Sequence, residues 1–250
     1  MIRSDILRCL HSWKIYVSFA CGLALMLHPL LRAWPFRDGF SPMSMLSIPL
    51  ATSDFTPFAS MFCVLPFAES FCEDLNSGFA FEITQRIGAK QYARKRVLST
   101  ALSGGIVTAL IMLVTIIVCC VGAGQPDTTD TVAFMNNSIW GKLGILTTAH
   151  GSILYALRVF VAFLFGMLWA LVGMCVSVLI PNRYVTLIAP FVLYQMLWFL
   201  LDETAVNPVY MFRGDSNYIP SFVFLVCWQV AWLAFCALFS YIGMTRRIYT

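Results

Sequence analysis

Charged side chains are scarce in this 250-residue sequence, at 11%, against about a quarter in an ordinary soluble domain. Hydrophobic residues make up 60% of it, and the mean hydropathy is +0.80. So few charges cannot give a folded globule a polar surface, which excludes an ordinary soluble domain. The alternating pattern of a membrane β-barrel is also missing, because the apolar runs are continuous. The sequence therefore predicts an all-α integral membrane protein.

The chain also lacks the short motifs of the common enzyme classes. It contains no HExxH, no GxSxG and no Walker A sequence, so nothing in it predicts a phosphate-binding loop or a catalytic residue. Its nine cysteines lie in or beside apolar runs, without a second pair at metal-ligand spacing. This placement is typical of small buried side chains and not of disulfides or a metal site. We expect no enzyme activity, no metal and no cofactor in this chain.

Six apolar runs approach the roughly 20 residues that a membrane-spanning helix needs. In a single transmembrane domain, 1–250, we expect spans at 15–31, 55–71, 97–121, 153–180, 184–201 and 221–243. Residues 1–14 have an amphipathic pattern that predicts a helix lying in the membrane interface, or an extension of the first span. A loop rich in proline, serine and aromatic residues is expected at 33–54, and a second loop at 202–220.

Small residues and prolines mark special positions within the spans. The second span is short and contains Pro57 and Pro66, which predicts a kinked helix. In the third span, Gly104 and Gly105 permit the close approach of a neighbouring helix.

The distribution of basic residues predicts the orientation, because cytoplasmic segments are enriched in lysine and arginine. With the N-terminus inside, 11 of the 16 basic residues are cytoplasmic: Arg3, Arg8, Lys14, Arg86, Lys90, Arg94, Lys95, Arg96, Arg183, Arg246 and Arg247. We therefore expect both termini in the cytoplasm. The net charge of +4 then reflects topology, and we expect no nucleic-acid partner.

The connector at 73–96, between the second and third spans, carries eight of the 28 charged residues. Its apolar residues recur at every fourth position: Phe79, Ile83 and Ile87. Glu82 and Arg86 have the same spacing on the neighbouring face, with the acid before the base, an order that stabilises a helix. The pattern predicts a short amphipathic helix lying along the membrane. A solvated, positively charged loop is the alternative.

Two ionisable residues lie within or beside the spans, where charge is costly and often functional. Arg158 lies about two turns inside the fourth span, and it either reaches the outer headgroups or faces an aqueous substrate path. Glu69 lies one turn before Glu73, at the inner end of the second span. The two acids could move protons, or they could lie at the interface and in water.

Around the connector, a span runs into an acidic residue, a glycine, a glutamate and an arginine, then a tyrosine and a lysine: Pro66 to Asp74, Ser77, Gly78, Glu82, Arg86, Tyr92 and Lys95. In this order of residues the sequence resembles the permease subunits of ABC-2 type transporters. These residues fall between about residues 64 and 100, and the number of spans and the chain length also resemble the family. The short 202–220 loop departs from exporters that have an ordered outer element between spans five and six.

The resemblance implies that 73–96 is a coupling segment that docks on a separate ATPase subunit. Its coupling residues would be Glu73, Gly78, Phe79, Glu82, Ile83 and Arg86. ATP and magnesium would be bound by two copies of that ATPase, and a second permease copy or a related permease would complete the path. An exporter of an amphiphilic peptide, drug or lipid-like molecule in the bacterial cytoplasmic membrane is then expected.

Two other functions remain open at this point. A non-transporting scaffold or sensor subunit would use the basic connector, with Lys90 and 94–96, to bind anionic lipid. An ion-coupled secondary transporter would use Glu69 and Arg158, although the sequence shows no internal repeat of the kind such transporters have.

Overall fold

The computed structural model describes residues 12–40, 42–123, 151–214 and 218–249. Within these ranges the chain forms helices and connecting turns, without a strand. Among the described residues, five helices are long and apolar enough to cross a membrane: α2 (Trp13–Ala33), α7 (Ala89–Gly122), α10 (Gly151–Leu179), α11 (Arg183–Leu200) and α13 (Phe222–Tyr249). The prediction of a multi-pass, all-helical membrane protein is thereby confirmed. The expected interfacial helix at 1–14 lies mostly outside the described residues.

The expected second span, 55–71, is not one helix. Helix α4 (Phe55–Val64) ends at a stretch of turns, and α5 (Ser70–Asn76) begins after it. Pro66 lies in this stretch, where its missing N–H and its ring oppose a continuous helix. Pro57 lies in the first turn of α4, where proline is tolerated. At 10 residues, α4 is about 15 Å long and too short to cross a bilayer alone.

Helical structure also fills most of the expected 33–54 loop. A 3₁₀ helix, η1 (Trp34–Gly39), is followed by α3 (Pro42–Thr52). Met45, Leu46 and Leu50 of α3 are buried in the main apolar core. The expectation of a loop was wrong for two reasons. The prolines lie near helix starts or are accommodated within the helix. In addition, helix formation buries the side chains of Met45, Leu46 and Leu50.

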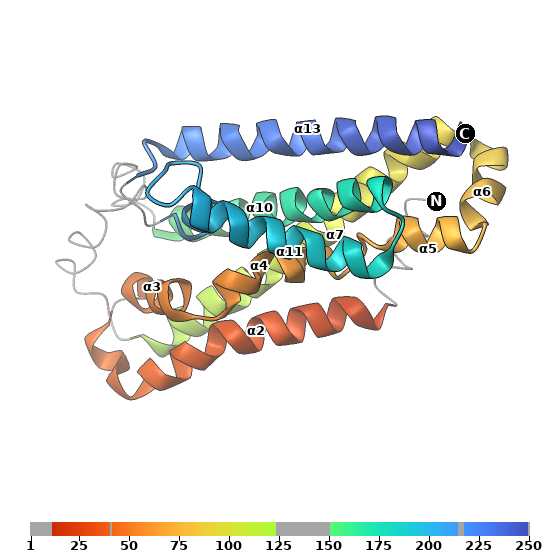
Figure 1. The fold of residues 1–250 in the computed structure, drawn as a ribbon. Coiled ribbons are helices and arrows are strands. Elements are labelled where there is room, and N and C mark those ends of the chain that lie inside the picture. Colours follow the sequence, from red (N-terminus) through yellow and green to blue (C-terminus); the bar gives the residue numbers. More distant parts are fainter. Residues whose placement is uncertain (1–11, 41, 124–150, 215–217, 250) are drawn as a thin grey trace.

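The long helices form an elongated bundle, and both α5 and α6 (Phe79–Ile87) lie at one end of it (Figure 1). Helix α2 begins at this end, and α13 finishes there (Figure 1). We call it the α6 end. Between α2 and α6, the chain returns from the opposite end through α3, α4 and α5 (Figure 1). The broken α4–α5 segment therefore covers the distance that a sixth long helix would cover.

The closest helix packing joins α7 to α10 at glycine positions. A Cβ added to Gly166 would lie 2.0 Å from Thr108 Oγ1 and 2.5 Å from the carbonyl oxygen of Gly104. Thr108 Oγ1 also lies 3.0 Å from the carbonyl oxygen of Ala162, to which it donates a hydrogen bond between the two helices. The expectation that Gly104 permits close helix approach is confirmed.

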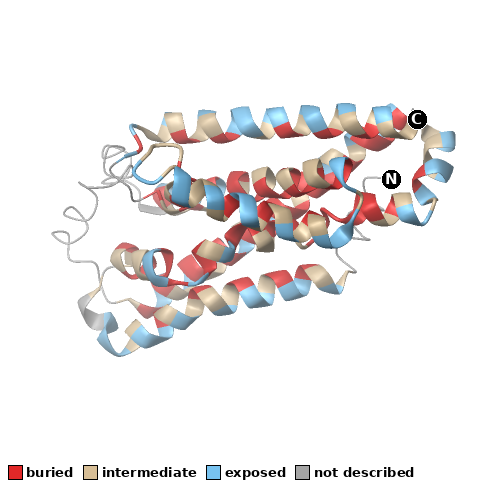
Figure 2. Cartoon of the chain, viewed as in Figure 1, coloured by how far each residue is buried: buried red, intermediate tan, exposed pale blue. Residues whose placement is uncertain are grey.

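Burial differs strongly among the long helices. Among the five candidate spans, α10 is the most buried and α11 and α13 are the least buried. Figure 2 shows exposed residues along the outer side of α13 and of α2. Many of the exposed residues of α13 are large and apolar, such as Phe235, which is 59% exposed. Such a surface is stable against lipid or another membrane helix, but not against water.

Candidate functional site

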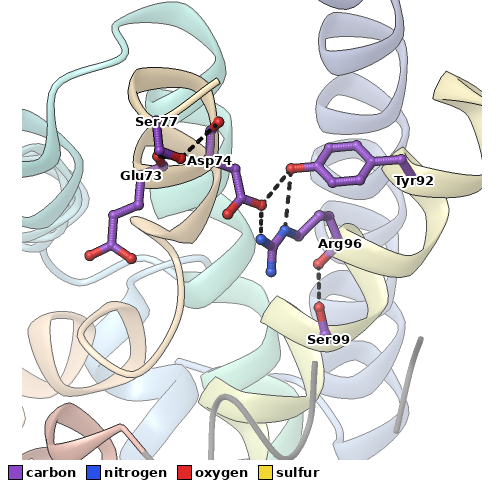
Figure 3. A network of polar contacts seen from close by, with 6 residues as sticks. All are labelled: Glu73, Asp74, Ser77, Tyr92, Arg96 and Ser99. Atoms are coloured by element: carbon purple, nitrogen blue, oxygen red, sulfur yellow. Dashed lines mark hydrogen bonds and ion pairs between the residues drawn. The ribbon is translucent and has the colours of Figure 1, made fainter. Parts of the chain in front are cut away.

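A buried polar cluster joins α5 to the beginning of α7 at the α6 end (Figure 3). Arg96 forms an ion pair with Asp74, and Tyr92 donates a hydrogen bond of 2.8 Å to the same carboxylate oxygen. The Nε group of Arg96 also donates to the Tyr92 hydroxyl at 3.4 Å. The three residues are 0 to 2% exposed. This is the most buried charged contact among the residues that the structure describes.

The local sequence explains why the cluster forms. Tyr92 and Arg96 are one turn apart on α7, so both side chains lie on the face turned towards α5. Aromatic rings surround the guanidinium, whose carbon lies 5.0 Å from the ring centre of Phe67 and 5.7 Å from that of Tyr92. Removing a charge from water costs several kcal/mol, so a buried pair requires such close partners. The cluster therefore fixes α5 against α7.

Lys14 makes a second charged contact at the same end. It forms ion pairs with Glu69 and, at 2.9 Å, with Glu73. The side chain of Glu69 is 7% exposed and that of Glu73 is 41% exposed. The Lys14–Glu69 ion pair thus connects the start of α2 to the turn before α5. This contact gives Glu69 a structural role and is no evidence for a substrate path. Glu73 shares the same lysine.

Gly78 sets the angle between α5 and α6. Its φ of +74° lies in the left-handed region, which residues with a Cβ adopt at a cost. Gly88, with φ of +81°, has the same role between α6 and α7. Two consecutive glycine-dependent turns explain why α6 runs across the end of the bundle instead of extending a neighbouring helix (Figure 1).

The inward face of α6 matches only in part the one that its sequence predicts. Ala80 is fully buried, and Ile83 and Ile87 are half-buried against the apolar cluster at this end. Phe79 is 42% exposed, although it begins the predicted apolar stripe. The buried side follows positions 80, 83 and 87, so the stripe is correct for its two isoleucines and wrong for Phe79.

The outer face of α6 combines charge with aromatic surface. Glu82 and Arg86 are exposed, as the sequence predicts. Phe81 is 48% exposed beside them. Of the expected coupling residues, the structure groups Phe79, Glu82 and Arg86 on the outer surface. Gly78 and Ile83 position the helix, whereas Glu73 forms an ion pair with Lys14 of α2.

Arg158 lies far from these residues, at the opposite end. It is 5% exposed, and its Nη1 donates to the carbonyl oxygen of Arg213, the last residue of α12 (Pro208–Arg213). Among the described residues the guanidinium is buried against α12. Whether Arg158 meets headgroups or faces a substrate path stays a prediction. The structure does not bring Arg158 and Glu69 together.

The described part of the expected 202–220 loop contains a short helix, α12. Asn207 accepts a hydrogen bond from the Val209 N–H and caps α12. Phe212 is buried, with its ring centre 4.9 Å from that of Phe165 in α10 and 5.5 Å from that of Phe55 in α4. The short helix therefore closes the end of the bundle opposite α6.

Sequence reasoning missed Asp74 and Arg96 as a pair. Both belong to a run of charged residues, a pattern that predicts a solvated segment. The only local signal for a shared buried face is the spacing of one turn between Tyr92 and Arg96.

Metal binding finds no support in the described ranges, which contain no group of three or more side chains able to hold an ion. The chain matches no protein-family model, and comparison with curated proteins and with solved structures gives no significant match.

Proposed function

We propose that this chain is the permease subunit of an ATP-binding cassette exporter of the ABC-2 type. In this proposal α6 is the coupling helix, and a separate ATPase subunit, present in two copies, binds ATP and magnesium. A second permease copy or a related permease completes the path. The substrate is amphiphilic, such as a peptide, a drug or a lipid-like molecule. The chain itself carries no ATPase activity.

One observation carries the proposal, namely the two-sided character of α6. Its inner side rests on the bundle through Ala80 and Ile83, and its outer side presents Glu82, Arg86 and the exposed ring of Phe79. Aromatic and arginine side chains are enriched where proteins bind each other. A short helix of this kind, fixed to the membrane helices, is suited to transmit movement from a soluble partner.

The clusters beside α6 supply the rigid connection that coupling needs. The Asp74–Arg96 pair joins α5 to α7, and Lys14 joins α2 to Glu69. A force applied to α6 therefore acts on the starts of two long helices as well as on the intervening turns. In a solvated loop the same force would be absorbed by backbone rotation.

The topology of the proposal places the α6 end in the cytoplasm. Basic residues are concentrated there, including Arg183 at the start of α11 and Arg246 near the end of α13. The α4–α5 return counts as the sixth crossing, which puts both termini on the cytoplasmic side. The membrane is then the cell membrane, and in a bacterium the inner membrane.

The test is purification of the tagged protein from its native membrane. We expect a Walker A protein to co-purify with it and the preparation to hydrolyse ATP in a vanadate-sensitive manner. The variants Glu82→Ala and Arg86→Ala should release the ATPase or uncouple hydrolysis from transport, while the amount of inserted protein stays the same.

Arg183→Ala is the matched control, because Arg183 is also exposed at the α6 end but belongs to α11. It should keep the ATPase. Retention of a fully coupled ATPase by both α6 variants would contradict the proposal, as would a native preparation without any ATP-binding protein.

The lipid-binding scaffold is a weaker candidate on the described geometry. One of its four expected cations, Arg96, is buried in the ion pair with Asp74 and is not available to headgroups.

A further inference from the structure

We infer that the surface between α7, α10 and α13 binds one anionic phospholipid of the leaflet at the α6 end. The site is a groove of about 500 Å³ whose lining is almost entirely apolar, with Arg94 at its rim. It is separate from the outer face of α6, and the inference does not depend on the proposed function.

Three helices build the groove. One wall comes from α7, where Arg94, Leu98 and Ala101 lie four and three residues apart and so share one face. The facing wall comes from α13, and Leu171 of α10 forms part of the floor and is fully buried. Leu98 is 43% exposed, so the groove opens sideways towards the surroundings of the bundle.

The groove has one charged end. The guanidinium of Arg94 lies over the ring of Tyr241, 5.8 Å from its centre, and both residues lie near the α6 end of their helices. Arg94 is exposed and makes no ion pair with any described residue. Lys90 is exposed one turn earlier on α7. The available charge at this end is therefore positive.

The position of Arg94 along α7 matches the depth of a headgroup. The charged residues of α7 end at Arg96, and from Val97 to Gly122 the helix has none. Arg94 thus lies where the helix changes from polar to apolar, and the rest of the groove extends into the apolar part. Juxtamembrane cations attract anionic headgroups, and an acyl chain fits the apolar walls. A free phosphate ion has no apolar part that could pack against those walls.

The test uses the protein in phosphatidylcholine nanodiscs that contain photoreactive lipid. One preparation carries a phosphatidylglycerol analogue with a diazirine in its acyl chain, and the other carries the matching phosphatidylcholine analogue. We expect the phosphatidylglycerol analogue to label residues 97–101 and 237–241 more strongly. Arg94→Gln should lower this preference by about fivefold, as expected for the loss of one cation near a membrane surface. Arg94→Lys should keep most of it.

Matched controls separate the site from general effects. Arg183 lies over the ring of Tyr184 at 4.9 Å, also at the α6 end but outside the groove. Arg183→Gln should therefore leave the labelling unchanged. Ala237→Phe should fill the groove and reduce labelling by both analogues, whereas Ala234→Phe, at an exposed position of the same helix that does not line the groove, should not.

Three results would overturn the inference. They are equal labelling of the groove by the two analogues, an unchanged preference in Arg94→Gln, and no labelling of the groove by either analogue. The last result would mean that a second copy of the chain or another membrane helix covers the groove. Melting temperatures of all variants show that they are folded, and if Arg94→Gln fails to fold, the alanine pair still tests the site.

Discussion

Tyr92 donates its hydroxyl hydrogen to the carboxylate of Asp74, at 2.8 Å, across the junction of α7 and α5. The same carboxylate oxygen forms the ion pair with Arg96. Without the tyrosine, this acid would have one partner fewer in a place that water does not reach. The contact between Tyr92 and Asp74 shows that the junction beside α6 is a packed polar core and not a solvated loop. Four predictions test the burial of this junction and the contacts next to it.

The first prediction concerns the buried ion pair. Arg96→Met should lower the free energy of unfolding by about 3–5 kcal/mol, because it leaves the buried Asp74 carboxylate without its charge partner. Chemical unfolding in detergent, followed by circular dichroism, measures the change. Lys90→Met removes an exposed cation of the same helix and should change the free energy by no more than about 0.5 kcal/mol.

The double variant Asp74→Leu with Arg96→Met removes both charges at once. It should recover most of the lost stability, since an apolar pair can replace a buried ion pair at little cost. Equal effects of Arg96→Met and Lys90→Met would show that the pair is not buried in the folded protein.

The second prediction compares the two acids that share Lys14. Glu69→Gln should cost about 1.5–3 kcal/mol of stability, because the Glu69 side chain is 7% exposed and makes a charged hydrogen bond. Glu73→Gln should cost less than about 1 kcal/mol, because this side chain is 41% exposed. Thermal unfolding of both variants shows which one loses more stability. A larger loss of stability in Glu73→Gln than in Glu69→Gln would contradict the prediction.

The third prediction concerns the contact of α7 with α10. In an open helix, glycine to alanine stabilises by up to about 1 kcal/mol. Gly166→Ala should instead destabilise by about 1–3 kcal/mol, because the new Cβ would meet Thr108 Oγ1 at 2.0 Å and the carbonyl oxygen of Gly104 at 2.5 Å. The sign of the change in unfolding free energy decides the question, and stabilisation would mean that the helices do not approach so closely.

The fourth prediction concerns the turn before α6. A Cβ on Gly78 would meet no atom within 4 Å, so only the left-handed backbone conformation opposes a side chain there. Gly78→Ala should cost about 1–2 kcal/mol, whereas Gly78→Asn should cost less, because asparagine tolerates this conformation.

Hydrogen exchange of the α6 amides measures this effect locally. Faster exchange over residues 79–87 in Gly78→Ala, with little change in α10, is the expected pattern. Identical exchange in the alanine and asparagine variants would show that the turn does not depend on glycine.

Some of the fold could be predicted because composition alone dictates it. Long charge-free runs such as 97–122 can be stable only as helices in lipid, since a backbone without water must satisfy its own hydrogen bonds. The glycines of α7 and the left-handed turn at Gly78 also have local causes that the sequence displays. The broken helix around Pro66 was expected only as a kink, because proline weakens a helix but the neighbours decide whether it ends.

The candidate site depended more on long-range contacts. Asp74 and Arg96 are separated by the whole of α6, and their pairing follows from two turns that fold α5 back onto α7. Apart from the one-turn spacing of Tyr92 and Arg96, the local pattern does not distinguish these charges from the exposed Glu82 and Arg86. Arg158 is a similar case, because its partner is a backbone carbonyl of α12, 55 residues away.

By itself, the sequence determined that the protein lies in lipid, that it is helical and where its polar connector lies. Each of these follows from local composition and periodicity. The tertiary structure alone decided which of the connector's charges are buried and which face outward. It also showed that Phe79 lies on the outer side and that a groove forms beside Arg94. The physical reason is that burial depends on neighbours from distant parts of the chain, and those neighbours are brought together only by the packing of the bundle.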